Sequence, residues 1–419
     1  MSRVLRRPIV AVSVLSVLVL SGCASDKELN TLDPQGPAAR SIDHLVRPVF
    51  IVAGIVFLFV EGAVLFLALR NRARHDDDEF PGQIHGNTRL EIGWTIVPAA
   101  IMTAIAVGTI ATLVDLNDTS ANAMEVTVDG TTTNWEPKVV VVGQQWWWEY
   151  RYYFDRDIQA SDLSDAKKLP PADIVTANQM VIPAGEEVEL IVTSRDVIHS
   201  HWIPKLNGKR DAVPNRFSPW KVEADEPGVY FGQCTEFCGL SHARMRMQVV
   251  ALDAADFRAW VETTSADAAP PSDAAAAWLE ARRSGNGDVA APDATAAERG
   301  LVLFTQQCTG CHLIEGVNDD TYEAAATVST AAPNLTHFAG RTTFAGGIFP
   351  TYTPDGAFNA EAVAAWIRDP AAVKANAADE GRGMPDLGLS ETQIADVVAY
   401  LETLGPRPAD WVIAATQVE

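Results

Sequence analysis

The sequence predicts a multidomain chain: a two-helix transmembrane hairpin, then an all-β domain, then an all-α domain. Three observations predict this order. Two apolar segments of membrane-spanning length lie near the N-terminus, strand-like residues follow them, and helix-period patterns around a Cys-x-x-Cys-His motif end the chain. A chain of 419 residues also exceeds one ordinary domain. The expected segments are a signal peptide (1–22), an N-terminal tail (23–44), a first membrane helix (45–70), a loop (71–91) and a second membrane helix (92–114). They are followed by the β domain (115–262), a linker (263–297), the α domain (298–406) and a C-terminal tail (407–419).

The first residues have the pattern of a secretory signal peptide. Three arginines precede an apolar run over residues 9–20, which is too short to span a bilayer. The run ends in Leu-Ser-Gly-Cys, which resembles a bacterial lipobox, in which the cysteine becomes the lipidated first residue of the mature protein. We therefore expect cleavage before Cys23 and a lipid anchor on it. A plain signal peptide that contains a cysteine by chance is the alternative.

Two longer apolar segments, 49–69 and 92–114, approach the roughly 20 residues that span a hydrocarbon core. Three arginines between residues 70 and 74 place the connecting loop in the cytoplasm, so the chain on either side of the hairpin is expected outside. Glu61 lies within the first span, where a carboxylate is costly unless it faces protein or water. A hydrogen-bonded carboxyl at a subunit interface is favoured over a proton site.

After residue 115 the pattern changes from helix to strand. Segments rich in β-branched and aromatic residues, or alternating with period two, are 139–142, 145–152, 180–193 and 245–252. Short strands with few helical stretches predict a β-sandwich or barrel. The interval 153–178, with four aspartates, is expected to be a surface insertion.

Soft metal ligands are grouped in this β domain. Cys234, Cys238, His242 and Met245 lie close together, and His199 lies upstream. Two thiolates, two imidazoles and a thioether favour copper over magnesium or calcium. Structural zinc sites use Cys and His without Met. A disulfide between the two cysteines is the other alternative, but it would leave the spacing of the His and Met unexplained.

Three stretches around these ligands resemble subunit II of heme-copper cytochrome c oxidase. They are Asp-Val-Ile-His-Ser at 196–200, Lys-Arg-Asp-Ala-Val-Pro at 209–214, and Gly-Gln-Cys-Thr-Glu-Phe-Cys-Gly-Leu-Ser-His-Ala-Arg-Met at 232–245. The resemblance covers the hairpin and the β domain, and it implies a cupredoxin fold that carries the dinuclear CuA centre. The implied copper ligands are His199, Cys234, the backbone carbonyl of Glu236, Cys238, His242 and Met245.

The resemblance implies further roles. The carboxylate of Glu236 would reach a magnesium ion at the contact with subunit I, and Trp146 would be the electron-entry residue above copper. The neighbouring Trp147 and Trp148 are assigned to packing, on opposite sides of a strand. Glu91 would lie at the mouth of a proton pathway of subunit I, and an interfacial acid favoured by the helix dipole is an equal alternative.

The chain between the β domain and the last domain, 263–297, is rich in Ala, Asp, Pro and Ser and is predicted to be a linker with one short helix near 274–283. A predicted helix over 298–307 then leads into Cys-Thr-Gly-Cys-His at 308–312. This motif marks covalent c-type haem attachment through Cys308, Cys311 and His312. A thioredoxin-like dithiol would need a βαβ context, which the sequence does not predict.

The second axial ligand of the haem is predicted to be Met384, because Met opposite His raises the reduction potential into the range of an electron carrier. His337 is a competing candidate. Segments 333–336 and 366–370 and a predicted closing helix over 390–404 resemble class I cytochrome c.

The whole chain therefore resembles subunit II of a caa-type oxidase, in which the donor cytochrome is fused to the CuA subunit. That implies electron flow from haem c through CuA to haem a and the oxygen-reducing site in subunit I. The implied partners are subunits I and III and a cytochrome bc-type reductase or another cytochrome c donor. The implied location is the bacterial plasma membrane, with both soluble domains on the extracytoplasmic face.

Two other functions fit the same motifs. One is a CuA-containing nitric oxide reductase subunit, and the other is a membrane-anchored electron-transfer lipoprotein without oxidase activity. The formal charge of −22 disfavours nucleic acid, whose phosphates attract Lys and Arg, and suits a basic protein partner.

Overall fold

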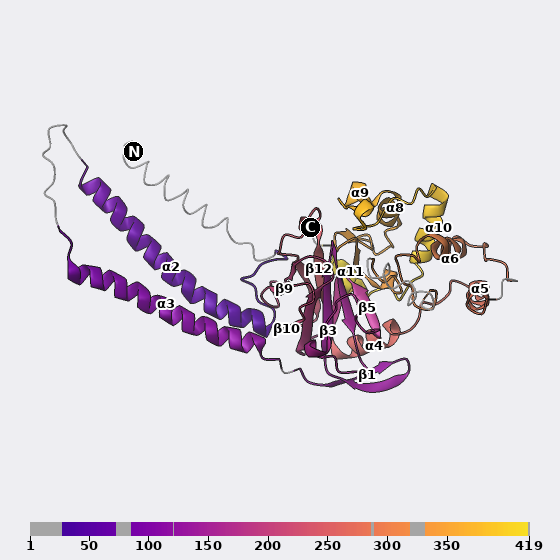
Figure 1. Cartoon of the computed structure of the whole chain (residues 1–419), viewed down its shortest axis with the longest axis horizontal. Helices are drawn as coiled ribbons and strands as arrows, with labels where there is room; N and C mark the ends of the chain where they lie inside the picture. Colours follow the sequence, from indigo (N-terminus) through magenta and orange to yellow (C-terminus); the bar gives the residue numbers. More distant parts are fainter. Residues whose placement is uncertain (1–26, 73–84, 120, 286–288, 319–331, 418–419) are drawn as a thin grey trace.

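The computed structural model describes residues 27–72, 85–119, 121–285, 289–318 and 332–417. Two long helices extend from a β-rich domain, and a helical domain packs on another side of that β domain (Figure 1). The predicted fold class is therefore confirmed. The lipidation residue Cys23 lies outside the described residues.

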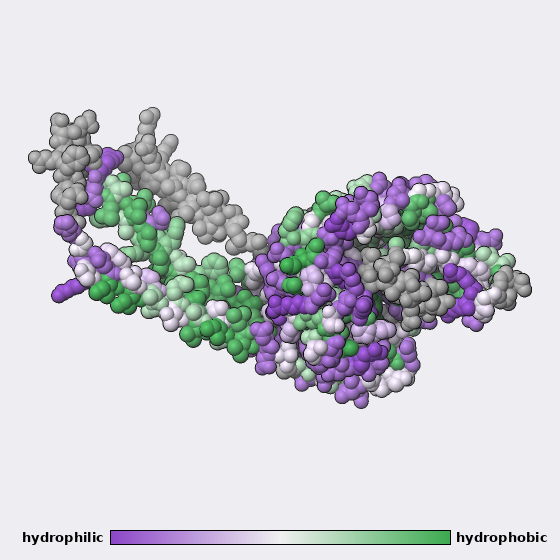
Figure 2. Space-filling view, viewed as in Figure 1, coloured by the Kyte–Doolittle hydropathy of each residue, from purple (hydrophilic) through white to green (hydrophobic). Residues whose placement is uncertain are grey.

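The hairpin consists of α2 (Pro37–Arg70) and α3 (Thr88–Asn117). Both helices are long and apolar enough to cross a membrane, and their apolar side chains form most of the hairpin surface (Figure 2). Helix α2 begins at Pro37 rather than near residue 45, because its first turns pack on the β domain: Ala38 and Ala39 are buried there, and Arg40 pairs with Asp225.

The β domain is a sandwich of two sheets. The larger sheet has the order β10-β7-β3-β4-β5, from Ser218–Val222, Val188–Ser194, Lys138–Gln144, Trp147–Tyr152 and Ile174–Ala177. The smaller sheet has the order β11-β12-β6, from Gly228–Gln233, Arg246–Leu252 and Gln179–Pro183. Two further hairpins pair β1 (Met124–Val128) with β2 (Thr131–Trp135), and β8 (His199–His201) with β9 (Arg210–Ala212).

Strand β3 lies in the middle of this domain and is buried along its whole length. Val139 and Val141 face the core between the sheets, while Val140 and Val142 join a second apolar cluster with Tyr153. The expected surface insertion thus covers the outer face of the larger sheet, and its last part forms β5. Apolar side chains on both faces explain the unbroken run of valines in β3.

The helical domain is built around the crossing of α6 (Ala296–Gln307) and α10 (Glu391–Leu401). Gly300 allows the close approach, since a Cβ there would overlap the carbonyl oxygen of Asp396. The domain also contains α8 (Ala360–Arg368), α9 (Pro370–Val373) and a short hairpin of β13 (Thr343–Phe344) and β14 (Phe349–Pro350).

Two segments differ from their sequence-based expectations. The predicted short helix near 274–283 is present as α5 (Asp273–Arg283), but it buries Ala275 and Leu279 in the core of the helical domain, so this part of the chain is not a free linker. Just before the expected linker, α4 (Ala254–Thr264) packs on the β domain. The expected C-terminal tail contains α11 (Asp410–Ala415), whose Val412 joins the core of the β domain. These short segments pack on surfaces formed by distant residues, so local composition did not reveal their packing.

Candidate metal and haem sites

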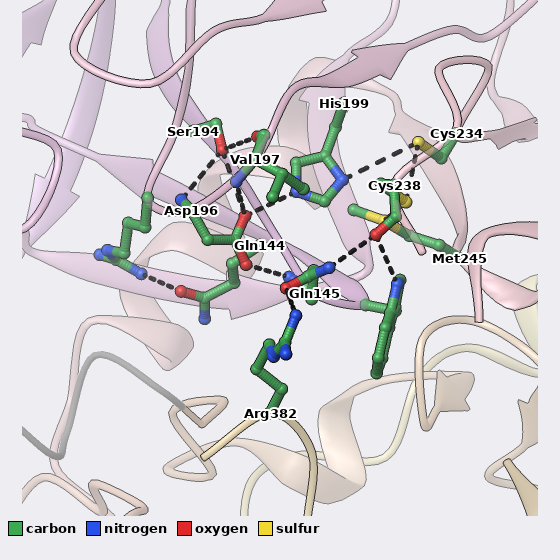
Figure 3. A network of polar contacts seen from close by, with 12 residues as sticks. Gln144, Gln145, Ser194, Asp196, Val197, His199, Cys234, Cys238, Met245 and Arg382 are labelled. Atoms are coloured by element: carbon green, nitrogen blue, oxygen red, sulfur yellow. Dashed lines mark hydrogen bonds and ion pairs between the residues drawn. The ribbon is translucent and has the colours of Figure 1, made fainter. Parts of the chain in front are cut away.

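The soft ligands predicted from the sequence meet at one end of the sandwich. Strand β8 supplies His199, and the loop from β11 to β12 supplies the other four. Cys234 Sγ lies 3.8 Å from Cys238 Sγ and 4.0 Å from His199 Nδ1 (Figure 3). Cys238 Sγ lies 3.6 Å from His242 Nδ1 and 3.8 Å from Met245 Sδ. The donors of two thiols, two imidazoles and a thioether thus converge.

Both cysteines are free and buried, so the disulfide alternative is not formed in this structure. The hydrogen bond between them lowers the pKa of Cys234, with help from His199, and raises the pKa of Cys238. A thiolate therefore lies beside a thiol whose proton a soft cation can displace. The backbone oxygen of Glu236 lies 3.3 Å from Cys234 Sγ, while the Glu236 side chain is exposed.

Asp196 orients His199 from outside the donor cluster. Its Oδ1 lies 2.8 Å from His199 Nε2, while the other imidazole nitrogen faces Cys234. The second oxygen, Oδ2, accepts a 2.7 Å hydrogen bond from the backbone N–H of Gln145. Burial is the largest influence and would raise the pKa of Asp196, but the hydrogen bond and charge of His199 together with two backbone N–H groups lower the pKa overall. A carboxylate on the far nitrogen of an imidazole fixes its tautomer and strengthens it as a metal ligand.

The three consecutive tryptophans occupy different environments. Trp146 lies in the turn between β3 and β4 and donates its indole N–H to the Cys238 carbonyl at 3.0 Å. Trp147 also lies beside a cavity in the helical domain, whereas Trp148 packs edge-on against His199. All three are buried, which agrees with the packing role expected for Trp147 and Trp148.

That cavity has a volume of about 440 Å³, and the predicted haem ligands line it. Cys308, Cys311 and His312 lie on its wall, as does Met384. His312 Nδ1 lies 2.8 Å from the Pro333 carbonyl and donates to it, which leaves Nε2 free to bind. Burial also lowers the pKa of His312, so the imidazole is neutral at pH 7. A neutral imidazole and a thioether are the donors that class I cytochromes use.

The competing axial candidate points elsewhere. His337 Nε2 lies 3.0 Å from the Ala266 carbonyl, at the contact between the helical domain and the segment before α5. Burial lowers the pKa of His337 to about 4, which keeps it neutral. His337 therefore ties the predicted linker to the domain, and it is not among the residues that line the cavity.

Comparison with known proteins identifies the family of this chain. Family models described as "Cytochrome C oxidase subunit II, transmembrane domain", "Cytochrome C oxidase subunit II, periplasmic domain" and "Cytochrome c" match residues 24–111, 138–252 and 297–405. A cytochrome c oxidase subunit 2 of Alkalihalophilus pseudofirmus is 33% identical over 390 residues, which are 92% of this chain and 94% of the relative. The chain belongs to the cytochrome c oxidase subunit II family.

Other relatives are similar over different lengths. Cytochrome c oxidase subunit 2 of Bacillus subtilis is 28% identical over 90% of this chain and 92% of its own length. Quinol oxidase subunit 2 of Bacillus spizizenii is 30% identical, but over 62% of this chain and 74% of its own length. This protein is thus a subunit II with a fused cytochrome c domain, part of a heme-copper oxidase that is anchored in the membrane with a periplasmic domain.

Family membership implies copper and haem c as cofactors of this subunit II. The donor chemistry fits both, because the described residues bring soft ligands together in one domain and covalent-attachment cysteines to a cavity in the other. Glu61 and Glu91 are both exposed on the hairpin, and Glu91 lies in the first turn of α3.

Sequence analysis missed three residues of this subunit II that the structure brings to the sites. Asp196 had a readable signal, since a carboxylate three residues before a ligand His is suited to orient it. Arg341 lines the cavity, and burial lowers its pKa to about 10. Lys374 reaches the cavity wall from the end of α9. Nothing local in the sequence distinguished these two cations from surface charges.

Proposed function

We propose that this subunit passes electrons from its own haem c, through a dinuclear CuA centre, to haem a and the oxygen-reducing site of subunit I. One observation carries the proposal. Trp146 lines the haem cavity and also donates its indole N–H to the carbonyl of Cys238, a copper ligand. A single side chain thus joins the walls of the two sites.

The five soft side chains would hold the copper ions. Cys234, Cys238, His199 and His242 would be the strong ligands, and Met245 would be a weak one. The backbone oxygen of Glu236 would complete the set. Two coppers that share two thiolates delocalise the transferred electron, which keeps nuclear rearrangement small. Asp196 and the β8 backbone hold the His199 ring in place before metal binds.

In the helical domain, Cys308 and Cys311 would form the thioether bonds, and His312 and Met384 would be the axial ligands. Asn376 Nδ2 donates to the Met384 carbonyl at 3.0 Å and so fixes the loop that presents the thioether. The buried guanidinium of Arg341 could pair with a haem propionate. Without this cation the propionate would be an uncompensated charge.

Roles at the contact with other subunits follow from exposure. The free carboxylate of Glu236 is available for a magnesium ion shared with subunit I, and Glu91 for the mouth of a proton pathway on the cytoplasmic side. Subunit III, an extracytoplasmic cytochrome c or bc-type donor and a lipid on Cys23 complete the proposed assembly. Mass spectrometry of the mature N-terminus tests the lipid, and an unmodified Cys23 would exclude it.

The copper assignment is tested by metal analysis and electron paramagnetic resonance of the purified oxidase. We expect two coppers per chain in the wild type, and loss of the mixed-valence signal in Cys238→Ser. Met245→Leu is the graded control, because the thioether is the weakest donor, and it should retain copper with a shifted potential. One zinc and no copper in the wild type would overturn the assignment.

The relay is tested through the haem. In Met384→Ala, His312 remains the only strong axial ligand, so the haem potential should fall by a fraction of the roughly 0.8 V range that axial ligands cover. Oxygen consumption with the physiological donor should then slow, while the copper signal persists. Wild-type turnover in this variant would show that electrons enter at copper directly and that the haem is a bystander.

A further inference from the structure

The helical domain contacts the copper domain through a specific loop. We call residues 344–349, which connect β13 and β14, the docking loop. It inserts against the copper domain so that the backbone N–H of Arg246, at the start of β12, donates to the Gly346 carbonyl at 2.8 Å. This bond extends the backbone hydrogen bonding of β12 from the copper domain to the helical domain.

Lys374, also in the helical domain, contributes to the same contact. Its ammonium donates to the Trp146 carbonyl at 2.6 Å and to the Ala345 carbonyl at 3.0 Å. One side chain of the helical domain therefore links the docking loop to the electron-entry turn of the copper domain. The same tryptophan binds the Cys238 carbonyl through its indole N–H, as described above.

Glycine is required for this approach. Gly346 has a φ of 84°, and a Cβ there would overlap the Lys374 ammonium and lie 2.8 Å from the Trp146 carbonyl oxygen. At Gly347, with a φ of 73°, a Cβ would lie 3.0 Å from backbone atoms of Arg246. Both glycines thus have the positive φ and the lack of a side chain that close backbone contact demands.

A second set of hydrogen bonds holds the loop's base. Thr342 donates its backbone N–H to Gln179 Oε1 at 3.0 Å and its hydroxyl accepts from Gln248 Nε2 at 2.6 Å. Gln248 also donates to Gln179 at 2.9 Å. All three side chains are at most 4% exposed. The two bonds of Thr342 form only when the domains are together, and their burial strengthens them, so they favour the docked arrangement over an open one.

The chemistry of this contact differs from that of a transient encounter complex. Across the described residues, the hydrogen bonds from Lys374, Arg244 and Ser241 end on carbonyl oxygens, and those of Gln248 and Thr342 on hydroxyl or amide oxygens. Burial lowers the pKa of Lys374 to about 7, with Arg244 adding to the effect. Of the two carbonyls that accept from Lys374, only that of Trp146 lies across the contact, so this part of the compensation exists only in the docked state. Such bonds are screened by salt far less than exposed charge pairs are.

We propose that Lys374 and the docking loop hold the haem domain permanently on the copper domain, with Lys374 as the positioning residue for the Trp146 turn. The electron-transfer test of this inference rests on the proposed relay, whereas the hydrogen-exchange test does not. The haem cavity and Trp146 then stay in contact between turnovers. Electron transfer takes place in this docked state rather than through repeated encounters on a tether.

Amide hydrogen exchange in the intact, fully loaded oxidase tests the contact. Lys374→Met keeps the apolar stem and removes the ammonium, while Gly346→Ala obstructs the loop without changing a charge. In both variants the amides of Arg246 and Thr342 should exchange roughly tenfold faster or more, because their acceptors lie across the contact. The Val141 amide in β3 is the internal reference and should not change.

Haem-to-copper electron transfer, followed optically after rapid reduction of the haem, gives the second readout. Wild-type transfer should keep the same rate from about 0.01 M to about 1 M salt, because docking is already complete. In Lys374→Met and Gly346→Ala the rate should fall at least several-fold. Lys168→Met, at an exposed lysine of the insertion, is the matched control and should behave as wild type in both readouts.

The outcomes separate the two proposals. One outcome is that the amides are protected in the wild type and exchange faster in the variants, while the wild type shows no haem-to-copper electron transfer. That outcome would support the docking inference and reject the relay. Wild-type exchange and transfer in both variants would overturn the docking inference and leave the relay standing. A wild-type rate that falls steeply with salt would also overturn it, because it would show a charge-driven encounter.

Discussion

The copper site and the haem site are built in opposite ways. The copper donors lie on β8 and one tight loop at the end of a sandwich, with sulfur and nitrogen atoms 3.6 to 4.0 Å apart. The haem donors line a cavity of about 440 Å³ in the helical domain, and Trp146 and Trp147 of the β domain form part of its wall. On the proposed assignment, the small ions would bind to a frame that is already folded, whereas the haem would fill space that the helical domain leaves open. The cofactor is an addition in one domain and a structural component in the other.

The largest expected effect is the different response of the two domains to loss of their cofactors. The cavity of about 440 Å³ is lined mostly by apolar side chains, so the helical domain lacks much of its packing when the haem is absent. We expect Cys308→Ser with Cys311→Ser to abolish cooperative unfolding of the helical domain in calorimetry. Copper removal by a chelator should leave the β domain folded. Equal losses in both experiments would break the comparison.

Removing the charge of one carboxylate should lower the unfolding free energy of the β domain more than that of the helical domain. Glu149 in β4 is buried and accepts hydrogen bonds from Arg195 at 2.7 and 2.9 Å and from Arg151 at 2.9 Å. Glu149→Gln should cost about 3–5 kcal/mol of unfolding free energy, because two buried cations lose their partner charge. Asp396→Asn, at the more exposed pair with Arg299, should cost less than about 1 kcal/mol. Denaturant unfolding of both variants checks this difference.

The Glu149 contribution has a defined pH dependence. Burial alone would raise its pKa, but Arg195 and Arg151 outweigh burial and lower the pKa from 4.5 to about 2. The unfolded chain therefore binds the proton more readily, and the stabilisation is complete above pH 4.5 and disappears as the pH falls toward 2. In Glu149→Gln the stability of the β domain should vary less over this interval. An unchanged slope would contradict the assignment.

The smallest expected effect concerns how each site holds its histidine. Asp196 orients His199 through a side chain, whereas a backbone carbonyl orients His312, so only the copper histidine can be released by a side-chain substitution. Asp196→Asn should weaken copper binding roughly tenfold, the lower end of the effect of such supporting groups on metal affinity. Competition with a copper chelator measures it, and the haem spectrum of the same sample is the control. Unaltered affinity would show that the strand alone positions the ring.

The sequence was most informative where chemistry depends on local spacing. The copper loop and the Cys-x-x-Cys-His motif carry their ligands within a few residues of one another, and the structure places Cys234 to Met245 together and Cys308 to His312 on one wall. Membrane spans are equally local, because twenty apolar residues in succession suffice to identify them.

Long-range packing was not predictable from these patterns. Trp146 was assigned to a strand but lies in the turn before it, because the register of β3 with β4 begins at Gln144 and Trp147. Lys374 looked like an ordinary surface lysine, since the carbonyls that bind it are 29 and 228 positions away in sequence. His337 was a reasonable axial candidate until the structure placed it against Ala266. The bond from Lys374 to Trp146 forms only after both domains have folded, and the His337 contact depends on how the segment before α5 packs.

The position of α11 has a consequence for biogenesis. The haem domain is inserted between α4, which packs on the copper domain, and α11, whose Val412 returns to that domain's core beside β11. Ribosomal synthesis and export proceed from the N-terminus, so the copper domain lacks part of its core until the last residues have crossed the membrane. The core of the copper domain is therefore completed only after the haem domain has been synthesised and exported. A chain that stalls or is cleaved within the cytochrome lacks α11 and therefore exposes apolar surface next to β11.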